Sequence, residues 1–212
     1  MPYLRTLVLD NVHISFWRLD ESSEEMWTLL CNLTDVSPYV ERFSRIGSEK
    51  RRCEWVAARC LVHRRVGASA KVAYHATGRP FLFSTGGETP EEISVTHAAN
   101  LVAVAFSSRG HRVGIDLEGD AKKAWRVRER FLSAEELQCL STPAEVLAAW
   151  CAKEATYKLC DVEGLRFMDD MQCGAIEKGQ LRMKLPSVGK EAVVGFSEVE
   201  QLCFALSQWR KP

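Results

Sequence analysis

Hydrophobic and polar residues alternate along the first half of the chain in a way that predicts both strands and helices. Residues 4–18 have the pattern of extended structure, and the capping residues 20–23 precede a helix with an apolar face. A second helix is expected from Ser48 to Val66, ended by Gly67. Four short apolar runs predict strands, near 71–76, 80–83, 93–97 and 101–106. A turn at 78–80 and a loop over 84–92 are expected between them.

The second half of the chain shows the same mixture of patterns. Strict alternation over 113–118 predicts a strand. Two helices are expected at about 133–140 and, past Pro143, at about 144–160. The tail, 165–209, alternates short apolar runs with turn residues and predicts further strands. We therefore expect an α+β fold with an N-terminal half, 1–110, and a C-terminal half, 111–212, each a mainly antiparallel sheet packed with helices.

Composition then narrows the class of protein. The 212 residues are 46% hydrophobic, enough to bury a core, and 28 basic residues balance 28 acidic ones, so no overall charge favours nucleic acid or membrane. The longest apolar run, Leu101 to Phe106, is too short to span a membrane, and no secretory signal is evident. Eight scattered cysteines without a C-x-x-C pair indicate reduced thiols in a cytoplasmic protein rather than a zinc or disulfide framework.

Candidate chemistry begins with two carboxylates on the strand 113–118. Asp116 and Glu118 project from the same face, about 7 Å apart, and repel each other unless something neutralises them. A hard divalent cation such as Mg²⁺ does this while leaving positions open for phosphate. The alternative is a strand face on which both carboxylates are simply hydrated.

A third carboxylate and a lysine come from the helix expected after Pro143. Trp150, Glu154 and Lys158 form one stripe on that helix, among alanines that predict burial. The alternative is an ordinary Glu–Lys helix pair. A buried pair is costly without a purpose, and a carboxylate with an ammonium would suit a metal-bridged diphosphate.

Basic residues elsewhere could contact anions. Arg52, Arg59 and His63 fall within about 40° of one another around the helix from Ser48, where the alternative is a solvated basic face. His97 ends a predicted strand, where a ligand could reach it, and the alternative is a structural histidine bonded to backbone.

Five motifs give the chain a resemblance to the 4′-phosphopantetheinyl transferase superfamily, in its longer Sfp-like type. They occur in the family order over residues 78–158. They are Gly78-Arg79-Pro80 (family G-[KR]-P), Ile93–His97 (x-x-x-S-H), Gly114–Glu118 (G-[IV]-D-[IL]-E), Arg130–Ser133 with Glu136 (R-F-[FL]-S-x-x-E) and Trp150–Lys158 (W-x-x-K-E-[AS]-x-x-K). The chain departs from the family at Thr96, usually Ser, and at Arg79, more often Lys.

The resemblance implies two similar α+β halves related by a pseudo-twofold, with coenzyme A in the cleft between them. It implies transfer of the phosphopantetheine arm to a serine of an acyl or peptidyl carrier protein. By this likeness Asp116, Glu118 and Glu154 would ligate Mg²⁺ or Mn²⁺, and Lys158 would contact the diphosphate. The remaining contacts to coenzyme A would come from Thr96, His97, Arg79, Pro80 and either Arg52 or Arg59.

The partner's serine is the nucleophile in such a reaction, so the chain needs none of its own. Glu154 or a water on the metal would take the serine proton. Carrier proteins of this type are acidic, and the basic segment Lys122–Arg130 is the expected docking surface, with a solvated helix face as the alternative. A monomer is expected, and a non-catalytic coenzyme A scaffold or sensor and a Mg²⁺-dependent nucleotide phosphohydrolase remain the other hypotheses.

Overall fold

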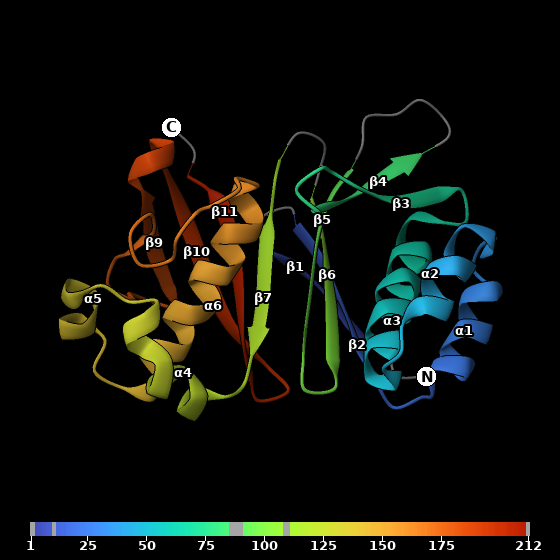
Figure 1. The fold of residues 1–212 in the computed structure, drawn as a ribbon, viewed down its shortest axis with the longest axis horizontal. Coiled ribbons are helices and arrows are strands. Elements are labelled where there is room, and N and C mark those ends of the chain that lie inside the picture. The colour runs from blue at the N-terminus through green and yellow to red at the C-terminus, as the bar shows by residue number, and fades with distance from the viewer. Residues whose placement is uncertain (1–2, 10–11, 85–90, 108–110, 211–212) are drawn as a thin grey trace. The chain divides into compact units, whose positions relative to one another are not determined.

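Two antiparallel sheets, each packed with helices, make up the described residues 3–9, 12–84, 91–107 and 111–210 of the computed structural model (Figure 1). One compact unit contains Met1–His75 and Pro80–His111, and the other contains Ala76–Arg79 and Arg112–Pro212. The predicted α+β class is therefore confirmed. Residues 85–90 of the expected loop lie outside the described residues.

The first unit is built on a six-stranded sheet with the order β1-β2-β6-β5-β4-β3. Its strands are β1 (Tyr3–Leu9), β2 (Val12–Arg18), β3 (Ala70–Tyr74), β4 (Pro80–Ser84), β5 (Glu91–Ala98) and β6 (Leu101–Ser107). Its helices are α1 (Ser23–Cys31), α2 (Val40–Arg45) and α3 (Glu49–Val66), with a 3-10 turn at Ser37–Tyr39. Every residue of β6 is buried, and α3 packs on β6 and β2. The central apolar run therefore forms the middle of the core.

The helix ends of this unit follow from capping residues in the sequence. Ser22 accepts from the backbone of Glu25, whose side chain accepts in turn from the backbone of Ser22. Ser48 caps α3, and Gly67 ends it with φ 87°, a conformation that favours glycine. Both predicted helices are confirmed, whereas α2 was not anticipated.

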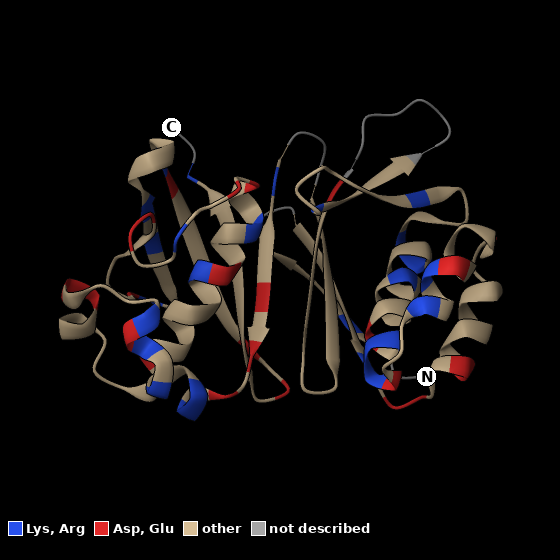
Figure 2. Cartoon of the chain, viewed as in Figure 1, with Lys and Arg blue, Asp and Glu red and all other residues tan. Residues whose placement is uncertain are grey.

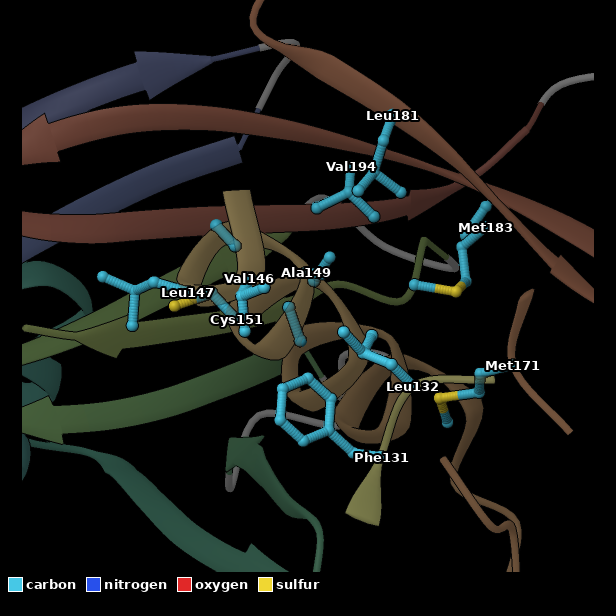
Figure 3. Close-up of a cluster of buried hydrophobic side chains, with 14 of the residues drawn as sticks. Phe131, Leu132, Val146, Leu147, Ala149, Cys151, Met171, Leu181, Met183 and Val194 are labelled. Carbon is cyan, nitrogen blue, oxygen red and sulfur yellow. The ribbon is translucent and has the colours of Figure 1, made fainter. Parts of the chain in front are cut away.

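The second unit carries a five-stranded sheet with the order β7-β11-β10-β9-β8. The strands are β7 (Gly114–Glu118), β8 (Gln172–Cys173), β9 (Gln180–Leu185), β10 (Lys190–Val199) and β11 (Leu202–Trp209). The helices are α4 (Ala121–Val127), α5 (Ala134–Cys139) and α6 (Pro143–Cys160), with 3-10 turns at Arg128–Arg130 and Pro186–Val188. Figure 3 shows part of the buried cluster of this unit, to which the segment before α5 contributes Phe131 and Leu132 and the sheet contributes Val194. The predicted strands of the tail are confirmed.

Gly114 allows β7 to lie unusually close to α6. A Cβ built on Gly114 would stand 1.8 Å from the carbonyl oxygen of Ala155 and 2.8 Å from the backbone nitrogen of Leu159. Both obstacles are backbone atoms, which cannot turn aside as a flexible side chain can. The glycine at the start of β7 therefore sets the distance between the strand and the helix that carry the candidate site.

A fully buried lysine holds the loops of the second unit together. Lys153 Nζ donates to Glu136 Oε2 at 2.8 Å, and both side chains are almost completely buried. The same ammonium donates to three backbone carbonyls, those of Phe131 (2.8 Å), Phe167 (2.7 Å) and Met171 (3.0 Å). Glu136 Oε1 also accepts from the backbone of Cys173 at 2.7 Å. Because the charge is paired and each oxygen is satisfied, this buried ion pair acts as a structural clamp.

Two further expectations concern the chain as a whole. All eight cysteines lie within the described residues and are free thiols, as predicted. No helix in the described part of the chain is both long enough and apolar enough to cross a membrane.

Candidate functional site

The motif residues of β7 and α6 meet in a direct ion pair. Asp116 is buried in β7, opposite Ala205 of β11, and its Oδ1 lies 2.9 Å from Lys158 Nζ. The same ammonium donates to the carbonyl of Ile115 at 3.0 Å. A strand and a helix far apart in sequence thus place a carboxylate and an ammonium of two motifs side by side.

The other two carboxylates lie around this pair. Glu118 Oε1 accepts from the backbone nitrogens of Gly119 (2.8 Å) and Asp120 (3.2 Å). Glu154 is partly buried, and burial raises its pKa, followed by repulsion from Asp116, while Lys158 opposes the shift and Glu118 adds to it. The negative charges of Asp116 and Glu118 are therefore felt at Glu154.

The arrangement of these side chains and the type of their donor atoms determine whether they could bind a cation. Within the described ranges, no group of three His, Cys, Asp or Glu side chains is arranged to hold a metal ion. Burial is the main reason that the pKa of Glu154 is raised, and the negative charges of Asp116 and Glu118 add to the shift while Lys158 opposes it. Oxygen donors with a surplus of negative charge are the ligand chemistry of Mg²⁺. Carboxylates are thus the type of donor that a hard divalent cation takes, but the described part of the chain does not arrange these three as a metal site.

Arg79 lies at the end of α6, within the second unit. Asp161 caps α6 in the left-handed conformation, φ 55° and ψ 41°, and its Oδ2 is 3.0 Å from Arg79 Nε. Both side chains are more than nine-tenths buried. Thr77 donates to the same carboxylate, and Arg112 lies 3.9 Å from it. Pro80, the next predicted residue, begins β4 of the first unit.

The face of α3 that carries Arg59 and His63 is not the solvated basic face that the sequence allowed. The Arg59 guanidinium lies 3.5 Å from the ring centre of Trp55 and donates to Tyr74 Oη at 2.6 Å, and the side chain is buried. His63 is buried between Tyr39, 3.0 Å from Nε2, and the carbonyl of Gly67, 3.0 Å from Nδ1. Contacts with aromatic side chains bury this face of α3, and helical spacing alone cannot show such contacts.

The remaining predicted residues of the first unit differ in exposure. Arg52 is partly buried and donates from Nε to the carbonyl of Ile46 at 2.6 Å. Thr96 is buried in β5, whereas the His97 side chain is 55% exposed, so a ligand can reach it as predicted. The partner of His97 is a carboxylate, Glu54 Oε1, at 3.4 Å from Nδ1, rather than the backbone.

The basic segment after β7 forms α4 and a 3-10 turn. Lys122, Lys123, Arg126 and Arg130 are exposed, and we call these four residues the α4 basic surface (Figure 2). Trp125 packs against the core instead, and Arg128 stacks over its ring at 4.3 Å. The helix thus presents cations outward while its aromatic residue anchors it.

Residues 112–205 match the model of the 4′-phosphopantetheinyl transferase superfamily. This stretch contains β7 and α6, and so the ion pair and all three carboxylates described above. A search of curated proteins found no match. For the second unit, the superfamily resemblance is therefore confirmed, and phosphopantetheine transfer is the general activity that it supports. The motifs at 78–80 and 93–97 lie outside the matched range.

Several residues that contact predicted residues within each unit carried no signal of their role in the sequence. Glu136 and Lys153 belong to quoted motifs, but only the structure shows that they pair with each other in the core. Glu54 and Asp161 lie outside the motifs and take their roles from partners distant in sequence, His97 and Arg79. A glutamate on an otherwise apolar turn of α3 is the one pattern that could have drawn attention to Glu54.

Proposed function

We propose that this protein transfers 4′-phosphopantetheine from coenzyme A to a serine of an apo acyl or peptidyl carrier protein. We propose further that it is a cytoplasmic monomer of the Sfp-like type. The observation that carries the proposal is the contact between Lys158 and Asp116 inside the superfamily match, which joins the two motifs most closely tied to this chemistry. Eight free thiols agree with a reducing compartment.

Asp116, Glu118 and Glu154 would hold Mg²⁺ or Mn²⁺ in this proposal. The ion, when bound, would neutralise negative charge on the diphosphate of coenzyme A. Lys158 Nζ donates to the carbonyl of Ile115 and to Asp116 Oδ1. An ammonium has three N–H donors, so one remains for a phosphate oxygen close to Asp116.

The chain's own cations would bind and orient the rest of coenzyme A. His97 is exposed and can donate to a phosphate oxygen. Thr96, the residue before it in β5, is assigned to the same phosphate. Arg79, fixed by Asp161, and Pro80 are assigned to the adenine and 3′-phosphate end. Of the two arginines on α3, we favour Arg52 for the 3′-phosphate, because Arg59 is enclosed by Trp55 and Tyr74.

The decisive experiment combines the protein with coenzyme A, Mg²⁺ and several apo carrier proteins and reads the intact mass of each carrier. A carrier that gains the phosphopantetheine mass supports the transferase. Binding of coenzyme A without any mass change would indicate a scaffold or sensor, and cleavage of coenzyme A without a carrier would indicate a phosphohydrolase. Either result would overturn the proposal.

The α4 basic surface is our proposed docking site for an acidic carrier. Reversing Lys122 and Arg126 to glutamate should raise the KM for the carrier while leaving the Kd for coenzyme A unchanged, because the exposed cations steer the partner rather than the co-substrate. The matched control reverses Arg182 and Lys184, two exposed cations on β9. An unchanged carrier KM, or an equal rise in the control, would remove the docking assignment.

A further inference from the structure

A nearly buried carboxylate on α3 holds the exposed histidine of β5. Glu54 lies in the middle of α3 with its side chain 10% exposed, and its Oε1 is 3.4 Å from His97 Nδ1. The same oxygen is 3.9 Å from Lys50 Nζ, one turn earlier on the helix. One carboxylate oxygen therefore lies within 3.9 Å of both a lysine ammonium and a histidine ring nitrogen, and both of these side chains are more than half exposed.

The contact at Nδ1 determines what the other end of the imidazole can do. The two ring nitrogens lie on different sides of the ring, so anchoring Nδ1 to Glu54 turns Nε2 away from the carboxylate. A carboxylate at one nitrogen of a histidine fixes both the orientation of the ring and the location of a proton. The contact with Glu54 therefore restrains the orientation of His97 at the end of β5.

We propose that Glu54 is a positioning residue that holds His97, and Lys50 beside it, to bind a phosphate group of coenzyme A. This inference rests on the function proposed above and adds two residues to its site. With Nδ1 beside the Glu54 carboxylate, Nε2 is the ring nitrogen left to meet a phosphate oxygen. A ring that is already oriented loses less freedom on binding.

Two substitutions at Glu54 separate its possible contributions. Glu54→Met keeps the length of the side chain but offers no oxygen, whereas Glu54→Gln keeps an acceptor and loses the charge. We expect Glu54→Met to weaken coenzyme A binding about tenfold, as measured by calorimetry on the full chain, because His97 and Lys50 would lose the carboxylate that orients them. Glu54→Gln should recover part of this loss. Glu24→Met, an exposed glutamate on α1, is the control and should bind as the unchanged protein does.

A spectroscopic measurement and a double-mutant cycle test whether Glu54 acts through His97. The ¹⁵N resonance of His97 Nδ1 should move in Glu54→Met and stay in place in the control. In a His97→Asn background, Glu54→Met should cost little further affinity, because its partner is already gone. An equal tenfold loss in both backgrounds, or an Nδ1 resonance that does not move, would overturn the positioning role.

The outcomes also separate this inference from the proposed function. If the unchanged protein fails to bind coenzyme A, the proposed function fails, and the inference fails with it. If the unchanged protein binds coenzyme A and modifies a carrier while His97→Asn and Glu54→Met bind normally, the function stands and the inference alone is refuted. Melting temperatures of all variants, compared with the control, identify any that fail to fold.

Discussion

Replacing Lys153 by methionine tests whether the buried ion pair of the second unit is a structural clamp. Methionine has a similar length and no charge, so the substitution removes the ammonium without emptying the core. Four oxygens lose Lys153 as a donor: Oε2 of Glu136, which keeps the backbone of Ser133, and the carbonyls of Phe131, Phe167 and Met171, all at 2.7–3.0 Å from the ammonium. The change therefore isolates the contribution of one cation to stability.

The expected cost follows from what remains behind. Removing one partner of a buried ion pair typically costs about 3–5 kcal/mol, because the other charge is left uncompensated. Each buried carbonyl that lacks a donor adds about 1–3 kcal/mol unless water reaches it. We therefore expect Lys153→Met to lower the free energy of unfolding by at least about 4 kcal/mol. Since domains are stable by about 5–15 kcal/mol, this loss would leave the second unit barely folded.

Urea unfolding, followed by tryptophan fluorescence and circular dichroism, measures this loss. Lys123→Met is the matched control, because the same chemical change is made at an exposed position on α4. It should alter the free energy of unfolding by less than about 0.5 kcal/mol. A loss below about 1 kcal/mol in Lys153→Met would refute the reasoning, since it would mean that the buried carboxylate needs no counterion.

A second substitution identifies the source of the cost. Glu136→Gln keeps the oxygen that accepts from the backbone of Cys173 but removes the charge. If an uncompensated charge is responsible, the double variant Lys153→Met, Glu136→Gln should be more stable than Lys153→Met alone. A double variant that is no more stable would assign the loss to the orphaned carbonyls instead.

Three further predictions follow from the structure. Gly114→Ala should cost about 3 kcal/mol and lower the melting temperature, because its Cβ meets the carbonyl of Ala155, whereas Gly195→Ala, with open space around it, should not; equal melting temperatures would contradict this. Asp116→Asn should abolish carrier modification in the mass assay yet keep the melting temperature within a few degrees, and measurable transfer would exclude Asp116 as an essential group. Burial lowers the pKa of His63 below 6.5, so the unfolded chain binds a proton at a higher pH than the folded chain does, and the free energy of unfolding falls as the pH drops below that value. In His63→Gln the urea midpoint should therefore depend less on pH between 7 and 5. An unchanged pH dependence would refute this linkage.

Local signals in the sequence were sufficient for most elements of the fold. Ser48 and Gly67 bound α3 in the structure as the capping rules predicted, and Pro143 begins α6. The short helix α2 was not anticipated, and a helix at α4 was considered only as the alternative to a docking segment, because six or seven residues give too few turns for a clear period. Elements with strong caps or long patterns were therefore predictable, and short ones were not.

The candidate site divides along a similar line. The likeness of Asp116 and Lys158 to family motifs pointed to one site, and the structure pairs them at 2.9 Å. Arg59 was expected to face solvent or ligand, but helical spacing cannot show that Trp55 and Tyr74 enclose its guanidinium. Contacts between residues distant in sequence, such as that of Glu54 with His97, are set by tertiary packing and leave no trace in a single sequence.

Two adjacent residues in the middle of α6 have different roles, one in stability and one in the proposed chemistry. Lys153 is buried and binds the loops of its unit, while Glu154, the next residue, is one of the three carboxylates that we propose as metal ligands. An alanine scan that recorded only lost turnover would therefore assign both to catalysis. Substitutions made to test the proposed role of Glu154 should therefore leave Lys153 unchanged, so that a folded protein remains to assay.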